Sequence, residues 1–507
     1  PISHMAAQSA HILVVNHALL LADIMTGSRV LPEYDYLIVD EAHHLESAST
    51  SALSFRITQT DFVRMLREIG STSSGMVGRL LGLLSHSLPP SDLASLNMSA
   101  HKIADLLFRL ENDFSDFIKT LSLFMEDMRE GQPVSNYGQQ TRIQPATRTL
   151  PAWSEVEIAW DNTTSSASAS LSLVSDFHKA VSDALGHPAE DIEDTLGSLA
   201  SVNRRLMESV DYLNKMVMEP DERYVYWVEV QPNTFRLVLQ AAPLNIGPMM
   251  EEYLWHEKSA IILTSATLTT NGEFDYLRNR LNADEADELV LGSPFDFETS
   301  TLLYLANDIA EPAEANAYQR EVESALIRLA KATGGRMLAL FTSYAQLKRT
   351  SQTISGALAE DDIQVFEQGE GASTNMLLET FRDSPRAVLL GTRAFWEGVD
   401  IPGEALSVLV IVKLPFDVPS DPIISARAET FDDPFNEYNL PEAILRFRQG
   451  FGRLIRTQSD RGVVVILDKR ILTKKYGRQF IESLPLCTQK KASTVDLPAS
   501  VTKWLNI

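Results

Sequence analysis

Short apolar runs recur towards both ends of the chain and predict buried strands. Residues 34–39 and 260–263 are almost continuously apolar and rich in strand-forming side chains. Runs of this kind are typical of strands buried on both faces of a parallel sheet. Further runs lie at residues 11–15, 336–341, 387–390, 406–412 and 462–467, and helical stretches such as 315–333 and 376–382 alternate with the later ones. The pattern predicts an α/β fold with a mostly parallel sheet.

The middle of the chain has a different pattern, because strand signals disappear between residues 47 and 219. Within residues 93–129 the apolar side chains fall on one helical stripe, formed by Ile103, Leu106, Leu107, Leu110 and Phe114. Residues 202–217 are similar, and the Ser/Thr-rich stretch 163–170 between them predicts a loop or linker. We therefore expect a mostly α-helical insertion. Strand patterning returns at residues 224–230 and 235–239, whose short separation predicts a hairpin.

Length and these changes of pattern set the predicted domain organisation. A chain of 507 residues is too long for one hydrophobic core. We predict that residues 1–46 and 220–300 form part of a first α/β domain. Residues 47–219 form the insertion, and residues 301–507 form a second α/β domain.

Composition describes an ordinary soluble globular protein, with 44% hydrophobic and 22% charged residues. The apolar runs are too short to span a bilayer, so we expect no membrane partner and a cytoplasmic location. Cys487 is the only cysteine, which excludes a disulfide framework and a thiolate metal site within these residues. The net charge of −24 opposes a polyanionic partner, yet residues 445–480 hold ten Lys or Arg against two Asp. This basic segment is compatible with a phosphate-bearing partner.

Polar residues that are suited to catalysis or ligand binding follow two of the predicted strands. Asp40 and Glu41 come directly after the run at 34–39, and ligand crevices in open α/β sheets lie outside the carboxyl ends of strands. One carboxylate can hold Mg²⁺ while its neighbour orients or deprotonates a water molecule. The alternative is a turn with two solvated acids. Ser265 and Thr267 follow the run at 260–263 and either relay contacts between two sites or satisfy local backbone groups.

Glycines punctuate two later stretches. Residues 391–403 contain three glycines, Gly398 among them, which let backbone approach a ligand closely. Within this stretch Glu397 and Asp400 are candidates to pair with arginines or to contact a ribose. Trp396 is either part of that site or a core residue.

The stretch at residues 449–456 carries the most specific pattern. On a helix, Gln449, Arg453 and Arg456 share one face, with an apolar stripe opposite. Gly450 and Gly452 would each cost about 1 kcal/mol of helix stability relative to Ala, which suggests close docking to an anion. A planar guanidinium suits a transferring γ-phosphoryl group. The alternative is a solvated basic helix.

Taken in order, these stretches resemble helicase motifs. Asp-Glu-Ala-His at residues 40–43 is the DEAH box of superfamily 2 helicases, and residues 265–267, 391–403 and 449–456 resemble motifs III, V and VI. The sequences at 16–20, 263–268, 395–400 and 449–456 resemble the DinG branch of the XPD-like helicases, and the likeness runs from about residue 10 to 485. The resemblance implies two RecA-like motor domains, the first one incomplete. The insertion takes the place of the family's helical arch domain.

The resemblance also implies roles for individual residues. Asp40 would hold Mg²⁺, and Glu41 would position the water that attacks ATP. Coupling of the nucleotide to the DNA groove would fall to His43, Ser265 and Thr267. Contacts to the nucleotide or its phosphates would come from Glu397, Gly398, Asp400, Gln449, Arg453 and Arg456. The implied activity is ATP-dependent 5′→3′ translocation on single-stranded DNA with unwinding of forked duplexes, in DNA repair, by a monomer. A non-catalytic nucleic-acid-binding protein built on a degenerate motor is the rival hypothesis, and an RNA-directed motor is a weaker one.

Two family features are missing from the sequence. There is no Gly-Lys-Ser/Thr phosphate loop, and the cysteines that ligate the family's iron–sulfur cluster are absent. Because the chain starts at Pro1, just before the DEAH-box strand, both absences favour N-terminal truncation over loss. We therefore expect the C-terminal portion of a helicase. An iron–sulfur cluster is expected only in a full-length protein, and this chain alone should not hydrolyse ATP.

Overall fold

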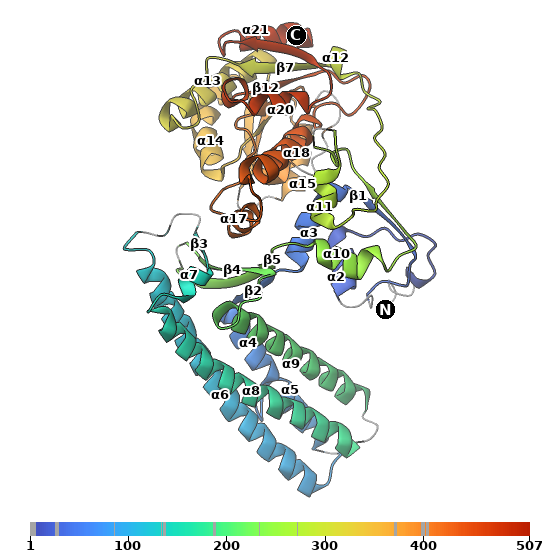
Figure 1. Cartoon of the computed structure of the whole chain (residues 1–507), viewed down its shortest axis with the longest axis vertical. Helices are drawn as coiled ribbons and strands as arrows, with labels where there is room; N and C mark the ends of the chain where they lie inside the picture. The colour runs from blue at the N-terminus through green and yellow to red at the C-terminus, as the bar shows by residue number, and fades with distance from the viewer. Residues whose placement is uncertain are drawn as a thin grey trace.

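The computed structural model describes residues 7–25, 30–85, 87–132, 134, 138–185, 189–232, 234–270, 272–369, 373–396, 401 and 405–507. Its strands form three sheets, of seven, four and two strands. Figure 1 shows the seven-stranded sheet at one end of the molecule and a group of long helices at the other. Within the described residues no helix is both long and apolar enough to cross a membrane.

The seven-stranded unit (residues 301–507) is a parallel α/β fold. Its strand order is β13-β7-β12-β11-β8-β10-β9, and every neighbouring pair is parallel. The strands are β7 Thr301–Ala306, β8 Met337–Leu340, β9 Gln364–Glu367, β10 Ala387–Gly391, β11 Val408–Ile411, β12 Gly462–Ile466 and β13 Thr488–Ala492. The predicted apolar runs of this region are therefore strands, and the parallel α/β prediction is confirmed.

Helices cover both faces of this sheet. One face packs against α13 Ala315–Thr333, α14 Tyr344–Ala359 and α21 Leu497–Leu505. The other face packs against α15 Thr374–Asp383, α18 Leu440–Phe451 and α20 Gly477–Glu482. Side chains of successive strand residues point to opposite faces, so a strand between two helical layers must be apolar throughout. This explains why β8, β10, β11 and β12 are fully buried.

The two-stranded unit contains the other predicted parallel strands. β1 Tyr36–Asp40 pairs in parallel with β6 Ala260–Thr264, so that Asp40 lies opposite Thr264. One face packs against α2 His17–Met25, α3 Leu45–Ala52, α10 Gly247–Met250 and α11 Asp275–Leu281. The prediction that β1 is buried on both faces is wrong, because Tyr36 and Ile38 are 76% and 68% exposed. The described helices cover only the face that carries Leu37 and Val39.

The run at residues 11–15 is not a strand either. These residues form no ladder with any described strand, and Ile12 and Val14 are 82% and 94% exposed. Helix α2 follows them directly. The side chain of Asn16 accepts a hydrogen bond from the Leu19 amide at 2.8 Å, which caps the amino end of α2.

We call the third region the arm. Its antiparallel sheet has the order β2-β5-β4-β3, with β2 Phe55–Thr58, β3 Gln139–Arg142, β4 Tyr224–Val230 and β5 Leu237–Pro243. β4 and β5 form the predicted hairpin. Its main helices are α4 Gln59–Ile69, α5 Gly75–Leu84, α6 Pro90–Asp127, α8 Trp153–Leu185 and α9 Glu190–Val217. They share one hydrophobic core and project away from the rest of the molecule (Figure 1).

The strand pairing of the arm crosses a predicted boundary. Strands β4 and β5 were expected to return to the first α/β domain at residue 220, but they pair with β2 and β3 from within 47–219. The domain limits stay predictions, and the pairing favours an arm that runs from about Phe55 to Pro243. The expected loop at 163–170 is wrong, since these residues lie inside α8. Their small side chains, including the buried Thr163 and Ser166, bring α8 close to α6, where both bond to Asp113.

Candidate functional site

The acidic pair lies at the edge of the two-stranded sheet. Asp40 is the last residue of β1, and its side chain accepts a hydrogen bond from the Glu41 amide at 2.9 Å. Glu41 adopts a left-handed backbone conformation (φ 50°), which is uncommon for a residue with a Cβ and often marks a functional turn. His17 of α2 donates from Nε2 to the Asp40 carbonyl at 2.9 Å. The turn is thus fixed from both sides, and both carboxylates remain exposed.

Glu41 is joined to the loop after β6 by a short relay. The Ser265 hydroxyl donates to Glu41 Oε2 at 3.1 Å and lies 2.6 Å from His43 Nδ1. A hydroxyl has one proton, so Ser265 accepts the hydrogen bond from His43 and the proton of the imidazole is on Nδ1. Burial, and then the nearby His44, Arg453 and His17, lower the pKa of His43 to about 3. His43 is therefore neutral at physiological pH.

The relay continues to the seven-stranded unit. The amide of Thr267 donates to Ser265 Oγ at 3.3 Å, and Gln449 Nε2 of α18 donates to Thr267 Oγ1 at 3.4 Å. One residue earlier, Arg448 donates to the carbonyl oxygen of Thr269. The structure therefore brings Glu41, His43, Ser265, Thr267 and Gln449 into one hydrogen-bonded chain between two sheets.

The expected helical face of Gln449, Arg453 and Arg456 is not observed. Helix α18 ends at Phe451, so both arginines lie in the segment beyond it. Arg453 Nε donates to the Trp396 carbonyl at 3.2 Å and lies close enough to His43 to lower its pKa. The Arg456 amide donates to Asp460 Oδ2 at 2.8 Å.

The two glycines of this stretch explain the difference. A Cβ on Gly450 would lie 2.9 Å from the indole ring of Trp396, so this glycine allows the helix to pack on the ring. Gly452 caps the carboxyl end of the helix. Trp396 itself is 3% exposed and donates to the Phe341 carbonyl at 3.2 Å, as a core residue does. The glycines thus serve packing and helix termination, where the sequence had suggested anion docking.

Three of the predicted site residues fall outside the described part of the chain, and one residue that contacts the loop after β6 was not predicted. Glu397, Gly398 and Asp400 lie outside the residues that the structure describes. Arg448 was not predicted, although it precedes Gln449 directly. Its lowered pKa, caused by burial, marks it as a docked side chain.

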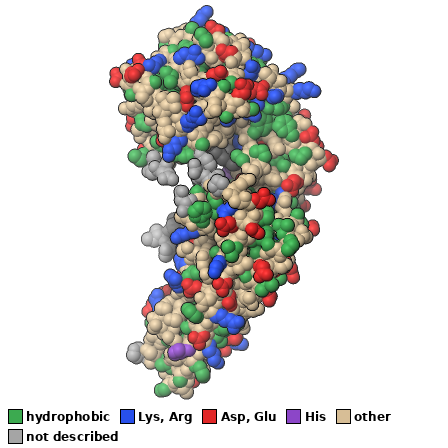
Figure 2. Space-filling view, turned by 90° about the vertical axis from the view of Figure 1, so that its left-hand side faces the viewer, with side chains coloured by type: hydrophobic (Ala, Val, Ile, Leu, Met, Phe, Trp, Pro, Cys, Tyr) green, Lys and Arg blue, Asp and Glu red, His purple; other side chains and the backbone are tan. Residues whose placement is uncertain are grey.

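The charges of the basic segment are partly neutralised by acids of the same chain. Several of its charges are paired with acids, as in Arg446 with Asp417 at 2.5 Å and Arg470 with the fully buried Asp468 at 2.6 Å. On the face shown in Figure 2, Lys and Arg side chains are scattered among Asp and Glu. The number of free cations is therefore lower than the sequence count suggests.

The acidic edge fits Mg²⁺ in the way that nucleotide sites usually do. Within the described residues no cluster of three or more His, Cys, Asp or Glu could form an all-protein metal cage. Mg²⁺ in phosphate-transfer sites takes only one or two carboxylates and completes its shell with water and substrate phosphates. Exposed Asp40 beside Glu41 provides that donor set.

Comparisons with known proteins bear on the family. A family model described as the helicase C-terminal domain matches residues 326–487. The chain is 28% identical to the 3′-5′ exonuclease DinG of Bacillus subtilis strain 168, over 98% of this chain and 54% of that protein. It is 29% identical to the ATP-dependent DNA helicase YoaA of Escherichia coli K12, over 94% and 67% of the two chains. It is 30% identical to the ATP-dependent helicase DinG of Mycobacterium tuberculosis H37Rv, over 95% and 64%. These matches make the chain similar, over most of its length, to ATP-dependent helicases of the DinG and YoaA type.

The DinG-like chain spans about half to two thirds of the length of these relatives. The matched helicase domain includes α18, Gln449 and both arginines, whereas the DEAH box and Ser265 precede it. A solved structure of apo XPD covers 92% of this chain at 17% identity and a TM-score of 0.49, a likeness too low to add to the assignment.

Proposed function

We propose that this chain is the C-terminal portion of an ATP-dependent 5′→3′ DNA helicase of the DinG type. It would couple ATP hydrolysis to translocation on single-stranded DNA and to the opening of forked duplexes. The observation that carries the proposal is the hydrogen-bonded chain from Glu41 through Ser265 and Thr267 to Gln449. It links the residue suited to activate water with the second sheet, as a motor requires.

Each side chain of this relay has a defined task in the proposed mechanism. Asp40 would bind Mg²⁺, which neutralises charge on the phosphate oxygens of ATP. Glu41 would orient the attacking water with the carboxylate that now accepts from Ser265. A rotation of Glu41 towards the water would release the Ser265 hydroxyl and would alter the bond that Ser265 accepts from the Thr267 amide. Gln449 would carry that change to the seven-stranded unit.

Arg453 and Arg456 would meet charge that develops on the γ-phosphoryl group. Both follow the end of α18, and Arg453 already lies near His43 of the DEAH box. A guanidinium that reaches the γ-phosphate across the cleft between the two-stranded and seven-stranded units would stabilise the transition state more than the ground state. Closing and opening the cleft in each ATP cycle would then move the protein along one strand.

The proposal is tested by ATPase measurements on two lengths of protein. We expect the 507-residue chain to bind ATP weakly and to show no measurable DNA-stimulated hydrolysis, because it has no Gly-Lys-Ser/Thr run to cradle phosphates. A longer version that contains a phosphate loop should hydrolyse ATP when single-stranded DNA is added. Robust hydrolysis by the 507 residues alone would refute the assignment as a portion of a motor. DNA binding without hydrolysis in the longer version would favour the non-catalytic alternative.

A further inference from the structure

The seven-stranded unit contacts the arm through a short helix. Helix α17, Pro422–Ala428, packs against β4 of the arm (Figure 1). Ala426 lies in a small apolar cluster with Val225 and Trp227 of β4 and with Ala242 of β5. A second contact joins Arg142 of β3 to Glu429, at the carboxyl end of α17, at 2.7 Å.

Arg427 is the polar centre of this junction. It is 7% exposed, and each of the three nitrogens of its guanidinium has a partner. Its Nε donates to the Leu244 carbonyl at 2.9 Å, and one terminal nitrogen donates to Thr50 Oγ1 at 2.7 Å and to the Pro243 carbonyl at 3.4 Å. The other terminal nitrogen lies 2.7 Å from Glu46 Oε1.

These partners mark the two points where the chain passes between the two-stranded unit and the arm. Thr50 is in α3, immediately before the chain enters the arm at β2. Pro243 ends β5, and Leu244 leads back towards α10. One side chain of the seven-stranded unit therefore bonds to both the entry and the exit of the arm.

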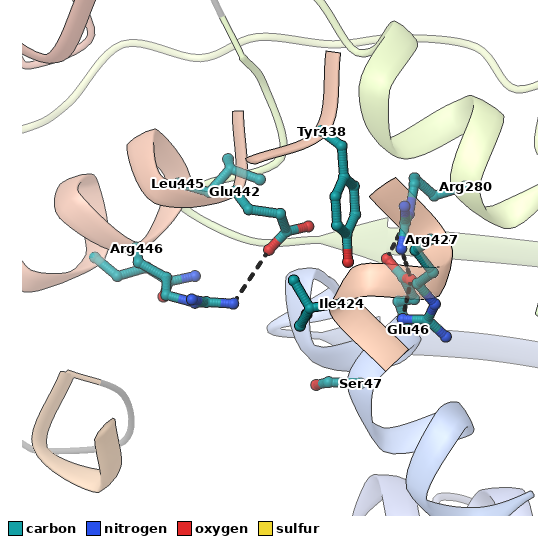
Figure 3. Close-up of a pocket in the computed structure, with 10 residues that line it drawn as sticks. Glu46, Ser47, Arg280, Ile424, Arg427, Tyr438, Glu442, Leu445 and Arg446 are labelled. Atoms are coloured by element: carbon teal, nitrogen blue, oxygen red, sulfur yellow. Dashed lines mark hydrogen bonds and ion pairs between the residues drawn. The ribbon is translucent and has the colours of Figure 1, made fainter. Parts of the chain in front are cut away.

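Glu46 balances the charge of this junction. Figure 3 shows Arg280 and Arg427 converging on its carboxylate. The three residues line a pocket of about 90 Å³. Burial alone would raise the pKa of Glu46, but Arg280 and Arg427 hold it below its ordinary value. Arg280 of α11 bonds to Glu46 at 2.8 Å and lies 4.8 Å from the Tyr438 ring centre. A buried charge that is paired and hydrogen-bonded in this way fixes geometry, because any displacement leaves charge uncompensated.

We propose that Arg427 is a positioning residue that fastens both crossings of the arm to the seven-stranded unit, so that the arm moves with that unit. The inference rests on the proposed function, because in a motor this link would transmit the opening and closing of the cleft to the arm. A rigid guanidinium fork suits the role, since it holds several acceptors in one plane. A Lys at this position would keep one contact and lose the others.

The test measures the position of the arm in the 507-residue chain, with neither ATP nor DNA present. Spin labels are attached at Ile158→Cys on α8 and Met376→Cys on α15, which are 58% and 60% exposed, whereas the native Cys487 is 6% exposed. Arg427→Ala should broaden the distribution of label–label distances. Arg280→Ala is the matched control, since it removes the other partner of Glu46 but has no hydrogen bond to an arm crossing within the described residues.

Hydrogen exchange gives a second readout. In Arg427→Ala the amides of residues 50–54 and 241–246 should exchange on the order of 10-fold faster, because hydrogen bonds to a charged group contribute that much to local opening. Arg280→Ala should leave residues 241–246 near wild type.

The outcomes separate the proposal from general loss of stability and from failure of the proposed function. If Arg427→Ala does not fold, Arg427→Lys provides the same comparison with a milder change. Equal broadening in the Arg427 and Arg280 variants, or an unchanged distribution in both Arg427 variants, would overturn the proposal. Because no nucleotide is used, a negative result leaves the helicase assignment untouched, and an inactive motor leaves this test valid.

Discussion

The two parallel sheets of the molecule are built from the same residue types but differ in how they are covered. In the seven-stranded unit, β8, β10 and β11 are buried along their whole length between two layers of helices. In the two-stranded unit, Tyr36 and Ile38 of β1 are largely exposed on the uncovered face. The comparison teaches that an apolar run predicts a strand, whereas its burial depends on which layers the rest of the fold supplies.

The candidate chemistry is divided between these two sheets. The two-stranded sheet (the thin sheet) carries Asp40, Glu41 and the loop with Ser265 at its edge. Helix α18, which packs on the seven-stranded sheet (the thick sheet), carries Gln449, and the two arginines follow that helix. If both edges serve one reaction, damage to either should be equally harmful.

The largest effect is expected from removing one reactive group from the two-stranded unit or one from the seven-stranded unit. In a longer version with a phosphate loop, Arg456→Ala and Glu41→Gln should each lower kcat by on the order of 10³ or more, with little loss of ATP affinity, because the charge they meet develops in the transition state. Arg456→Lys should rescue little. The measurement is steady-state ATPase with saturating single-stranded DNA, beside nucleotide-binding titrations.

The same assay ranks the arginines. Near-wild-type kcat in Arg456→Ala would assign the main phosphate contact to Arg453, which the structure places nearer His43. Near-wild-type kcat in Ala variants of both would refute the division of chemistry between the sheets.

The next effect compares the cores of the two sheets. Leu389 of β10 is 0% exposed, so Leu389→Ala should destabilise the chain by about 2–5 kcal/mol through lost burial and the cavity it leaves. Ile38 of β1 is 68% exposed, so Ile38→Ala should change stability by less than about 0.5 kcal/mol. Urea unfolding of the 507-residue chain measures both. Equal losses would mean that the outer face of β1 is covered in solution.

A smaller effect tests the role of the glycines. Gly450→Ala should cost about 1–3 kcal/mol, because the new methyl group would meet the Trp396 ring at 2.9 Å. Gly452→Ala is the control, since its methyl group would have only ordinary contacts at 3.5 Å or more and φ is −65°. It should be neutral or slightly stabilising. Thermal unfolding distinguishes the two, and equal effects would contradict a packing role for Gly450.

These cases show which features the sequence could predict and which features it could not. The strands of the thick sheet were predictable, because burial on two sides demands uninterrupted apolar runs. Glu41, Ser265 and Gln449 were predictable from their motifs, but the hydrogen bonds between them join segments more than 180 residues apart. The helix end at Phe451 was missed although Gly452 is a local stop signal, and the reason for Gly450, its packing on Trp396, is a tertiary contact that no local pattern reveals. Arg427 carries no motif, and only the fold shows that it lies between two chain crossings.

The last effect concerns proton binding at the edge of the thin sheet. His43 has a pKa of about 3 in the folded chain, against an ordinary value of 6.5. Between these values the unfolded chain binds a proton that the folded chain does not, so stability should fall as pH decreases below about 6.5. The loss from this group should approach about 1.4 kcal/mol per pH unit between these two values.

His43→Gln isolates that contribution. The variant keeps a donor for Ser265 but cannot take up a proton, so its stability should depend less on pH between about 6.5 and 4.5. Urea unfolding at several pH values, compared with His101→Gln on the exposed surface of α6, provides the measurement. If His43→Gln and wild type lose stability in parallel over this range, His43 is already protonated in the folded chain. Ser265 would then accept from a cationic ring, and the relay at the thin sheet would carry a positive charge beside Glu41 in place of a neutral hydrogen bond.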